Sequence, residues 1–250
     1  MTIVICTYRR DEVYVTLNIL NLLSAPFPTI KVLVVDNHGD DRLREFCASI
    51  YVDYIHEERL GLSFARNAAL ELTKGDWVYF IDDDVYVTEE LLEALSVSHS
   101  HDDILYSYVV SAVTPVIDGE FVGISLANSL SIHGKALVPI GCSFGFYNNG
   151  VIGFDTSLGR VGRNLAGEEE NVLISELLES GRKLRLLNAS IVHRIGNKLN
   201  VDYVVNYYES QVLASGNYRR LRLLFHITRS FLTKNSKIYR RSLMKVYKKL

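Results

Sequence analysis

Three apolar runs in the first third of the chain each end abruptly in polar residues. They are Thr2–Cys6, Lys31–Val35 and Trp77–Ile81, followed by Thr7-Tyr8-Arg9-Arg10, Asp36-Asn37 and Asp82-Asp83-Asp84. Continuous runs of this length are typical of strands that are buried on both faces, as in parallel sheets. We therefore predict three buried strands whose carboxyl ends carry polar and acidic side chains.

Residues at helical spacing lie between these strands. The predicted helices comprise Val13, Leu17 and Leu20 behind Asp11 as N-cap, residues 40–50, and Phe64, Ala68 and Leu72 behind Ser63. Strands that alternate with helices predict an α/β fold with a doubly wound, mostly parallel, Rossmann-like sheet and helices on both faces. Ligands of such sheets bind beyond the carboxyl ends of the strands, where the polar residues are expected.

The triplet Asp82-Asp83-Asp84 indicates a cation site. Three adjacent carboxylates raise the cost of ionising one another unless a cation joins them. Oxygen ligands favour Mg²⁺ or Mn²⁺ over zinc. The alternative is a solvated acidic turn that caps the next helix at Thr88-Glu89-Glu90.

A second acidic cluster, Glu168-Glu169-Glu170, opens an apparent helix that ends at Gly181. Its apolar side would be formed by Val172, Leu173, Leu177 and Leu178. Acids in a first helical turn also suit the helix dipole, so the cluster alone admits a structural or a catalytic role. His193 ends a short apolar strand, Ser190–Val192, and is either a solvated strand end or a ligand.

Composition narrows the class of protein. With 250 residues, 48% of them hydrophobic, the chain can bury one sizeable core. It has no run of about 18 apolar residues and no signal-peptide pattern at its start. The cysteines Cys6, Cys47 and Cys142 are isolated and odd in number, which predicts neither a zinc site nor a disulfide framework. We expect a cytoplasmic protein.

Charge is unevenly distributed. Residues 219–250 carry eleven of the 27 Lys and Arg and no acid, interleaved with apolar residues. This pattern predicts basic amphipathic helices that lie on an anionic membrane surface, such as the inner face of the plasma membrane. A tail that is solvated, or packed on the body or on a partner subunit, remains the alternative. Nucleic-acid binding is not expected, because the acidic remainder would repel phosphate.

Further polar residues complete a predicted pocket. Asp36 can accept a hydrogen bond from a base imide or a ribose hydroxyl. The loop of residues 58–67 leads into a helix N-terminus, which favours anions, and Arg66 adds a forked donor. The alternative for Arg66 is a surface ion pair. Together with a metal, these groups indicate a site for a nucleotide diphosphate.

The ordered motifs resemble the family 2 glycosyltransferases, which have the GT-A fold. The resemblance covers residues 1 to about 215 and rests on Ile3–Arg10, Val34–Asn37, Gly61–Asn67, Phe80–Asp84, Gly167–Asn171 and Ile191–His193. It implies a GT-A domain over residues 1–215, with a nucleotide-binding half (1–100) and an acceptor-binding half (101–215). Residues 216–250 would form the basic helical tail.

The resemblance also implies residue roles. The nucleotide-binding residues would be Thr7, Tyr8, Arg9, Asp36, Arg66, Asp82 and Asp83, and the Mn²⁺ or Mg²⁺ site would comprise Asp84, Asp82 and His193. Glu170 aligns with the family's usual aspartate and would be the catalytic base, while Glu169 would orient the acceptor. Glutamate reaches one methylene further than aspartate, which keeps Glu169 in contention as base. Segment 141–149 matches the strand before the acceptor region, but Asn148-Asn149 replaces the usual arginine pair.

The expected function is inverting transfer of a sugar from a nucleotide-diphospho-sugar, with UDP favoured by the resemblance. The acceptor would be a saccharide or glycolipid in cell-surface polysaccharide synthesis. A sugar nucleotidyltransferase is disfavoured because Thr7-Tyr8-Arg9-Arg10 lacks the glycine of a phosphate loop. A non-catalytic scaffold that binds nucleotide-sugar or membrane remains the other alternative. The sequence leaves the oligomeric state open.

Overall fold

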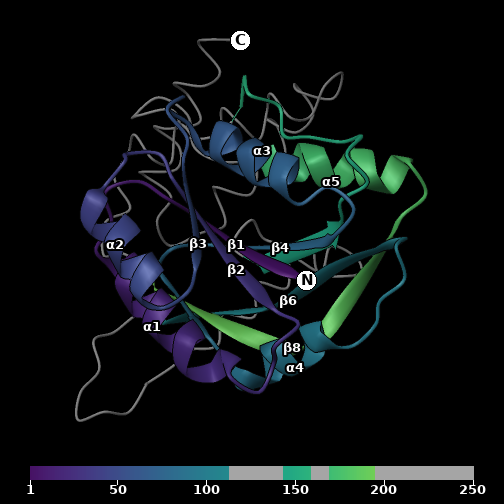
Figure 1. The fold of residues 1–250 in the computed structure, drawn as a ribbon. Helices are drawn as coiled ribbons and strands as arrows, with labels where there is room; N and C mark the ends of the chain where they lie inside the picture. Colours follow the sequence, from purple (N-terminus) through teal and green to yellow (C-terminus); the bar gives the residue numbers. More distant parts are fainter. Residues whose placement is uncertain (113–142, 159–168, 195–250) are drawn as a thin grey trace, which may run out of the picture.

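The computed structural model describes residues 1–112, 143–158 and 169–194 (Figure 1). Within these residues one mixed sheet has the strand order β3-β2-β1-β4-β7-β6-β8-β5. The strands are β1 (Thr2–Thr7), β2 (Lys31–Asp36), β3 (Asp53–His56), β4 (Trp77–Ile81), β5 (Val85–Val87), β6 (Asp103–Ala112), β7 (Ser143–Tyr147) and β8 (Lys183–Arg194). The helices are α1 (Glu12–Ser24), α2 (Asp41–Ser49), α3 (Leu62–Leu72), α4 (Glu89–Ser96) and α5 (Glu169–Glu179).

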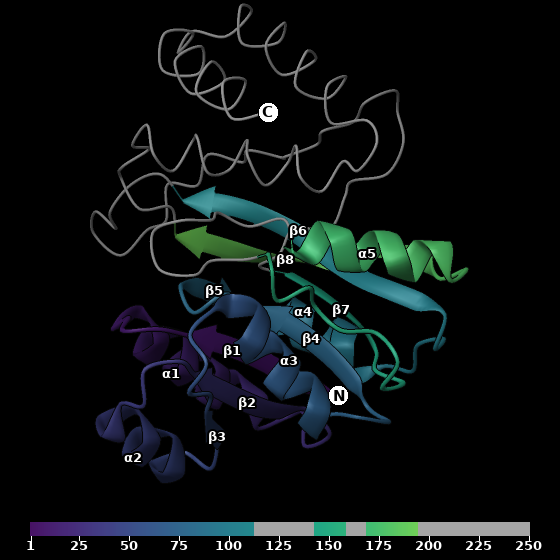
Figure 2. The same cartoon turned by 90° about the horizontal axis from the view of Figure 1, so that it is seen from above.

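The four strands of the first half are parallel. β1 pairs with β2 on one side and β4 on the other, with Thr7 opposite Asp36 and Ile5 opposite Ile81. The three predicted strands are confirmed, and each predicted end lies within one residue of the observed one. Beyond β4 the sheet turns antiparallel at β7, and β6 and β8 then run side by side in parallel (Figure 2).

Helices cover both faces of the sheet, as the sequence predicts. Buried residues of α1, α2 and α4 pack on one face in a core that includes Ile5, Tyr79 and Leu105. Buried residues of α3 and α5 pack on the other face around Phe80 and Phe144 (Figure 1). Strand order reverses at β1, since β2 follows on one side and β4 on the other. That reversal is the place where doubly wound sheets bind ligands.

The ends of the helices differ in part from expectation. In α1 the predicted face of Val13, Leu17 and Leu20 is buried, but the Asp11 side chain makes no capping hydrogen bond. Asp11 has helical dihedral angles, and a side-chain N-cap needs an extended residue. Thr88, which is extended, does cap α4 by accepting a hydrogen bond from Leu91 N.

The predicted buried face of α3 is wrong. Ala65, Ala69 and Leu70 are buried against the sheet, whereas Leu72 is 61% exposed. Two faces of this helix carry apolar side chains, one with Phe64, Ala68 and Leu72 and one with Ala65 and Ala69. The helical spacing alone therefore did not identify the buried face. The small alanines allow the helix backbone to approach β1 and β2 closely, and the larger Phe64 is left half-buried beneath the guanidinium of Arg59.

Asn148 anchors the end of α3 to the end of β7. Its buried amide donates to Leu70 O at 2.6 Å and to Thr73 Oγ1 at 3.2 Å. Asn148, at a position where the resembling family carries arginine, therefore stabilises the contact between α3 and β7 here. The strand predicted at Ser190–Val192 is the last part of the longer β8.

None of the helices in the described part of the chain is long and apolar enough to cross a bilayer. The boundary at 215, the basic tail, Cys142 and Glu168 lie outside the described residues.

Candidate active site

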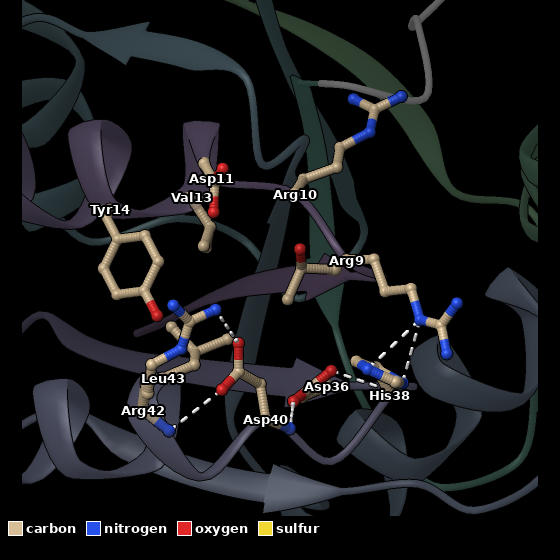
Figure 3. A pocket seen from close by; sticks show the side chains of 11 residues that line it. Arg9, Arg10, Asp11, Val13, Tyr14, Asp36, His38, Asp40, Arg42 and Leu43 are labelled. Atoms are coloured by element: carbon tan, nitrogen blue, oxygen red, sulfur yellow. Dashed lines mark hydrogen bonds and ion pairs between the residues drawn. The ribbon is translucent and has the colours of Figure 1, made fainter.

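A polar pocket of about 150 Å³ opens at the carboxyl ends of β1 and β2 (Figure 3). It is lined by Thr7, Arg9, Arg10, Asp11, Val13, Tyr14, Asp36, His38, Asp40, Arg42 and Leu43. The predicted residues Thr7, Arg9 and Asp36 are thus brought together. Tyr8 lies beside them, with its ring in an edge contact to His38 at 5.7 Å between centroids.

Asp36 organises the wall of this pocket. Its buried carboxylate accepts hydrogen bonds from His38 N and Asp40 N, both at 2.7 Å, and from Tyr54 Oη at 2.9 Å. Burial and the bond to Asp36 raise the pKa of Tyr54, so its hydroxyl stays protonated and donates. Asp36 therefore holds the turn after β2 in place, in addition to facing the pocket.

Arg9 has a left-handed backbone, with φ of +53°. This conformation is strained for an arginine. Its side chain turns toward His38, with Nε 3.1 Å from Nε2 of that ring, as Figure 3 shows. The turn sends Arg9 and the next residue, Arg10, in different directions from one strand end.

The acidic triplet lies next to the same strand end. Because Ile5 pairs with Ile81, the residues two further on, Thr7 and Asp83, also lie opposite each other, and Thr7 Oγ1 donates to Asp83 Oδ2 at 2.6 Å. Arg10 Nη1 donates to Asp83 Oδ1 at 3.0 Å and to Asp84 Oδ2 at 2.8 Å. The sequence predicted no role for Arg10, although it is the last residue of the first motif.

The alternative of a solvated, helix-capping acidic turn is wrong. Asp83 is only 5% exposed, and Thr88 rather than the triplet caps α4. Thr16 Oγ1 lies 2.9 Å from Asp83 O and from Val85 O, which fixes the backbone between β4 and β5. Burial raises the pKa of Asp83 to about 6, against the opposing effects of Arg10 and the Thr7 hydrogen bond.

The second acidic cluster is joined to Arg66 of α3. Arg66 Nη1 lies 2.7 Å from Glu169 Oε1 and 3.7 Å from Glu170 Oε2. Arg66 is only 3% exposed, so the alternative of a surface ion pair is wrong. The guanidinium also lies against the rings of Phe80, at 5.9 Å, and Phe154, at 5.2 Å.

Glu169 and Glu170 occupy different environments. Glu169 is buried, and burial together with the charge of Glu170 raises its pKa to about 7 in spite of Arg66. Its Oε2 has no hydrogen-bond partner among the described residues. The side chain of Glu170 is 17% exposed and can therefore meet a ligand.

Arg66 links the two acidic clusters electrostatically. Burial would lower its pKa, but the charges of Glu169, Glu170 and Asp82 raise it instead. Cys6 lies in the same neighbourhood, and burial raises the pKa of its thiol to about 12, so it is neutral. Carboxylates from the end of β4 and the start of α5 thus converge around one buried guanidinium.

The helix α5 is bounded as predicted at its C-terminus. Gly181 has a φ of +94°, its N–H bonds to Leu178 O, and Arg182 N bonds to Leu177 O. These two bonds form a Schellman motif, in which glycine is favoured at the left-handed residue.

A hard divalent cation fits the acidic triplet in part. Asp83 and Asp84 each direct one oxygen at a single cationic nitrogen, so this pair already binds positive charge. In residues 1–112, 143–158 and 169–194, no group of three His, Cys, Asp or Glu side chains could hold a metal by itself. Mg²⁺-type ions are commonly held by one or two carboxylates with substrate phosphates completing the shell. The backbone of His193 lies opposite Val85, the residue that follows Asp84.

The first part of the chain is similar in sequence to known glycosyltransferases. The sequence profile of Glycosyl transferase family 2 matches residues 2–119. The succinoglycan biosynthesis protein ExoM of Rhizobium meliloti is 32% identical over 98 residues, which are 36% of this chain and 32% of that protein. Glycosyltransferase GlyA of Streptococcus pneumoniae is 26% identical over 100 residues, covering 38% of this chain and 14% of GlyA. The matches thus span about a third or less of these relatives.

Solved structures share the fold. The mannosyltransferase PcManGT from Pyrobaculum calidifontis, in complex with GDP-Man and Mn²⁺, has a TM-score of 0.58 at 13% identity, over 98% of this chain and 68% of PcManGT. TarS 1-349 of S. aureus, in complex with UDP-GlcNAc, has a TM-score of 0.59 at 18% identity, over 86% of this chain and 65% of TarS. The predicted GT-A fold is confirmed by this likeness.

Replacing Arg66 by methionine is expected to lower the free energy of unfolding by about 3–5 kcal/mol at pH 8, because it leaves Glu169 buried and charged. Without Arg66 the raised pKa of Glu169 rises further. A raised carboxyl pKa lowers stability as pH climbs from the unfolded value to the folded one. The loss should therefore be smaller at pH 5 than at pH 8.

Urea unfolding of Arg66→Met at both pH values measures this difference. Arg44→Met, which removes an exposed arginine paired with Asp41, is the control and should change stability by less than about 1 kcal/mol. An equal loss for Arg66→Met at pH 5 and pH 8 would contradict the assignment of Glu169 as the buried charge.

Proposed function

We propose that this chain, whose residues 2–119 match Glycosyl transferase family 2, transfers a sugar from a nucleotide-diphospho-sugar to a saccharide or lipid-linked acceptor with inversion. One observation carries the proposal. Buried Arg66 is bonded to Glu169 at the start of α5 and also feels the charge of Asp82 after β4, while Asp83 and Asp84 bind Arg10, which lines a polar pocket. Inverting transfer needs two separate sets of residues, one that binds the diphosphate and one that supplies a base for the acceptor hydroxyl.

The pocket at β1 and β2 is proposed to receive the nucleoside. Thr7, Arg9 and Asp36 line it, and the exposed ring of Tyr8 contacts His38 of its wall. Asp36 retains acceptor capacity after its three internal bonds, because a carboxylate has about four lone-pair sites. A base imide or a ribose hydroxyl can use that capacity.

The diphosphate is proposed to lie over the acidic triplet with Mn²⁺ or Mg²⁺. Asp84 would be the main ligand, Asp82 would face the ribose and the metal, and His193 would lie nearby on β8. When bound, the cation would supply positive charge to the departing diphosphate. Asp83 is proposed to support the site without contacting the metal, since one of its oxygens already accepts a hydrogen bond from Thr7 and the other from Arg10.

Glu170 is proposed as the base. It is the accessible member of the pair, whereas Glu169 is buried and bonded to Arg66. Glu170 would take the proton of the acceptor hydroxyl while that oxygen attacks the anomeric carbon. The bond from this carbon to the diphosphate oxygen then breaks, and the diphosphate leaves with the electron pair. Arg66 and Glu169 would orient Glu170 and the acceptor, and Arg66 would carry positive charge toward the diphosphate side.

The acceptor is proposed to be a growing cell-surface polysaccharide or glycolipid. Support comes from ExoM, a relative named as a succinoglycan biosynthesis protein. Synthesis at the cytoplasmic face of the membrane would give residues 219–250, with eleven basic side chains, a role in membrane attachment. A UDP-sugar is the first donor to test, followed by a GDP-sugar, since structural neighbours bind one or the other.

Calorimetric titration of UDP, GDP, dTDP and CDP into the chain, with and without Mn²⁺, tests the donor site. We expect one nucleotide to bind in a Mn²⁺-dependent way, and Asp84→Asn to weaken that binding by about tenfold or more, since it removes a charged ligand. Glu71→Gln, at an exposed position on α3, is the control and should bind like the wild type. If no nucleotide binds with Mn²⁺, the proposed donor site is wrong.

Glu170→Gln is expected to lower the transfer rate by about 10²–10⁴-fold while nucleotide affinity stays unchanged, because it removes only the proton acceptor. Glu169→Gln should lower the rate less and should also reduce stability, since it weakens the pair with Arg66. Transfer assays with the donor identified by calorimetry measure both. A larger rate loss in Glu169→Gln than in Glu170→Gln would move the base to Glu169.

A further inference from the structure

Arg10 occupies the place where the acidic triplet would receive a cation. A single nitrogen, Nη1, lies 3.0 Å from Asp83 Oδ1 and 2.8 Å from Asp84 Oδ2. Asp84 is also the residue proposed as main metal ligand. One carboxylate oxygen cannot bind a guanidinium nitrogen and a metal ion at full strength at the same time, so the two cations compete.

We propose that Arg10 is a resident counter-ion that blocks metal binding at Asp84 until the nucleotide arrives. This inference rests on the proposed function, because it takes Asp84 to be a metal ligand. It adds a switch within the site: without donor the carboxylates bind Arg10, and with donor they bind the metal.

The donor-free chain needs such a cation. Asp83 is only 5% exposed and has a further carboxylate on either side of it in the sequence. Arg10 places one positive charge within 3.0 Å of Asp83 and 2.8 Å of Asp84. Arg66 is bonded instead to Glu169 of the second cluster.

Arg10 is also placed so that it can leave. Its side chain is 38% exposed and contacts both carboxylates through one nitrogen rather than through a two-nitrogen fork. In Figure 3 it points away from Asp36 and Arg42. Rotation about its side-chain bonds can release it to solvent without opening either core. Arg66, which is buried, has no such route.

Release of Arg10 couples metal binding to nucleotide binding. No group of three His, Cys, Asp or Glu side chains among the described residues could hold the ion by itself, so phosphate oxygens would have to complete its shell. Arg10 lines the nucleoside pocket, and its freed guanidinium would face the added negative charge of the diphosphate. The metal alone should therefore bind weakly, and each ligand should strengthen binding of the other by the same factor.

Electron paramagnetic resonance of free Mn²⁺ tests this on the full chain without nucleotide. Arg10→Gln is expected to bind Mn²⁺ about tenfold more tightly than the wild type, the size expected when one charge-assisted hydrogen bond no longer competes. The strengthening of Mn²⁺ binding by the nucleoside diphosphate should be smaller in Arg10→Gln than in the wild type. Arg44→Gln removes the same charge from an exposed pair with Asp41 and should leave Mn²⁺ affinity within about twofold.

Equal or weaker Mn²⁺ binding in a folded Arg10→Gln would overturn the inference, even where Asp84→Asn shows that the metal site itself exists. Absence of Mn²⁺ binding in every variant, with and without nucleotide, would instead remove the proposed metal site and the inference together. If Arg10→Gln does not fold, Arg10→Lys is used instead, because it keeps the positive charge. In the ¹⁵N NMR spectrum of Arg10→Lys the Arg10 side-chain signal is missing, which identifies that signal in the wild type. In the wild type that signal should change when Mg²⁺ and nucleotide are added, and an unchanged signal would also overturn the inference.

Discussion

The need to neutralise buried negative charge at the carboxyl ends of the parallel strands governs this site. Parallel pairing of β1 with β4 places Thr7 against Asp83, and the chain then supplies Arg10 from the next turn. On the other side of the strand end, buried Arg66 is bonded to Glu169 of α5. Each arginine balances carboxylates that would otherwise protonate or repel one another. The two arginines differ in one respect, because Arg10 can reach solvent and Arg66 cannot.

That difference separates a fixed part of the site from a changeable one. The Arg66–Glu169 pair is enclosed by Phe80 and Phe154 and holds the start of α5 in one position relative to α3. Glu170, next to it, can then present its carboxylate to an acceptor in a constant orientation. The Arg10–Asp84 contact is half-exposed and can exchange one cation for another. With the proposed roles of Glu170 and Asp84, a fixed base would lie beside an exchangeable cation site, which would suit a transferase that binds and releases its donor in every cycle.

Much of the fold could be predicted from the sequence, because buried parallel strands leave long apolar runs with polar ends. The same local reasoning could not choose the inner face of α3, where Ala65 and Phe64 begin two apolar stripes. Nor could it tell that Asp83 is the buried acid, since that follows from the register of β1 against β4. The pair of Arg66 with Glu169 joins residues 103 positions apart and leaves no local signal. Arg10 could have been recognised, because it is the last residue of the first motif.

The proposed mechanism depends on a metal-bound diphosphate at the acidic triplet. Crystals of the chain grown with Mn²⁺ and the nucleoside diphosphate identified by calorimetry would test it through the anomalous signal of manganese. The account predicts one manganese peak within coordination distance of both Asp84 and the diphosphate, with the Arg10 guanidinium displaced from Asp84. A bound nucleotide without manganese at Asp84, or with Arg10 still bonded there, would contradict it.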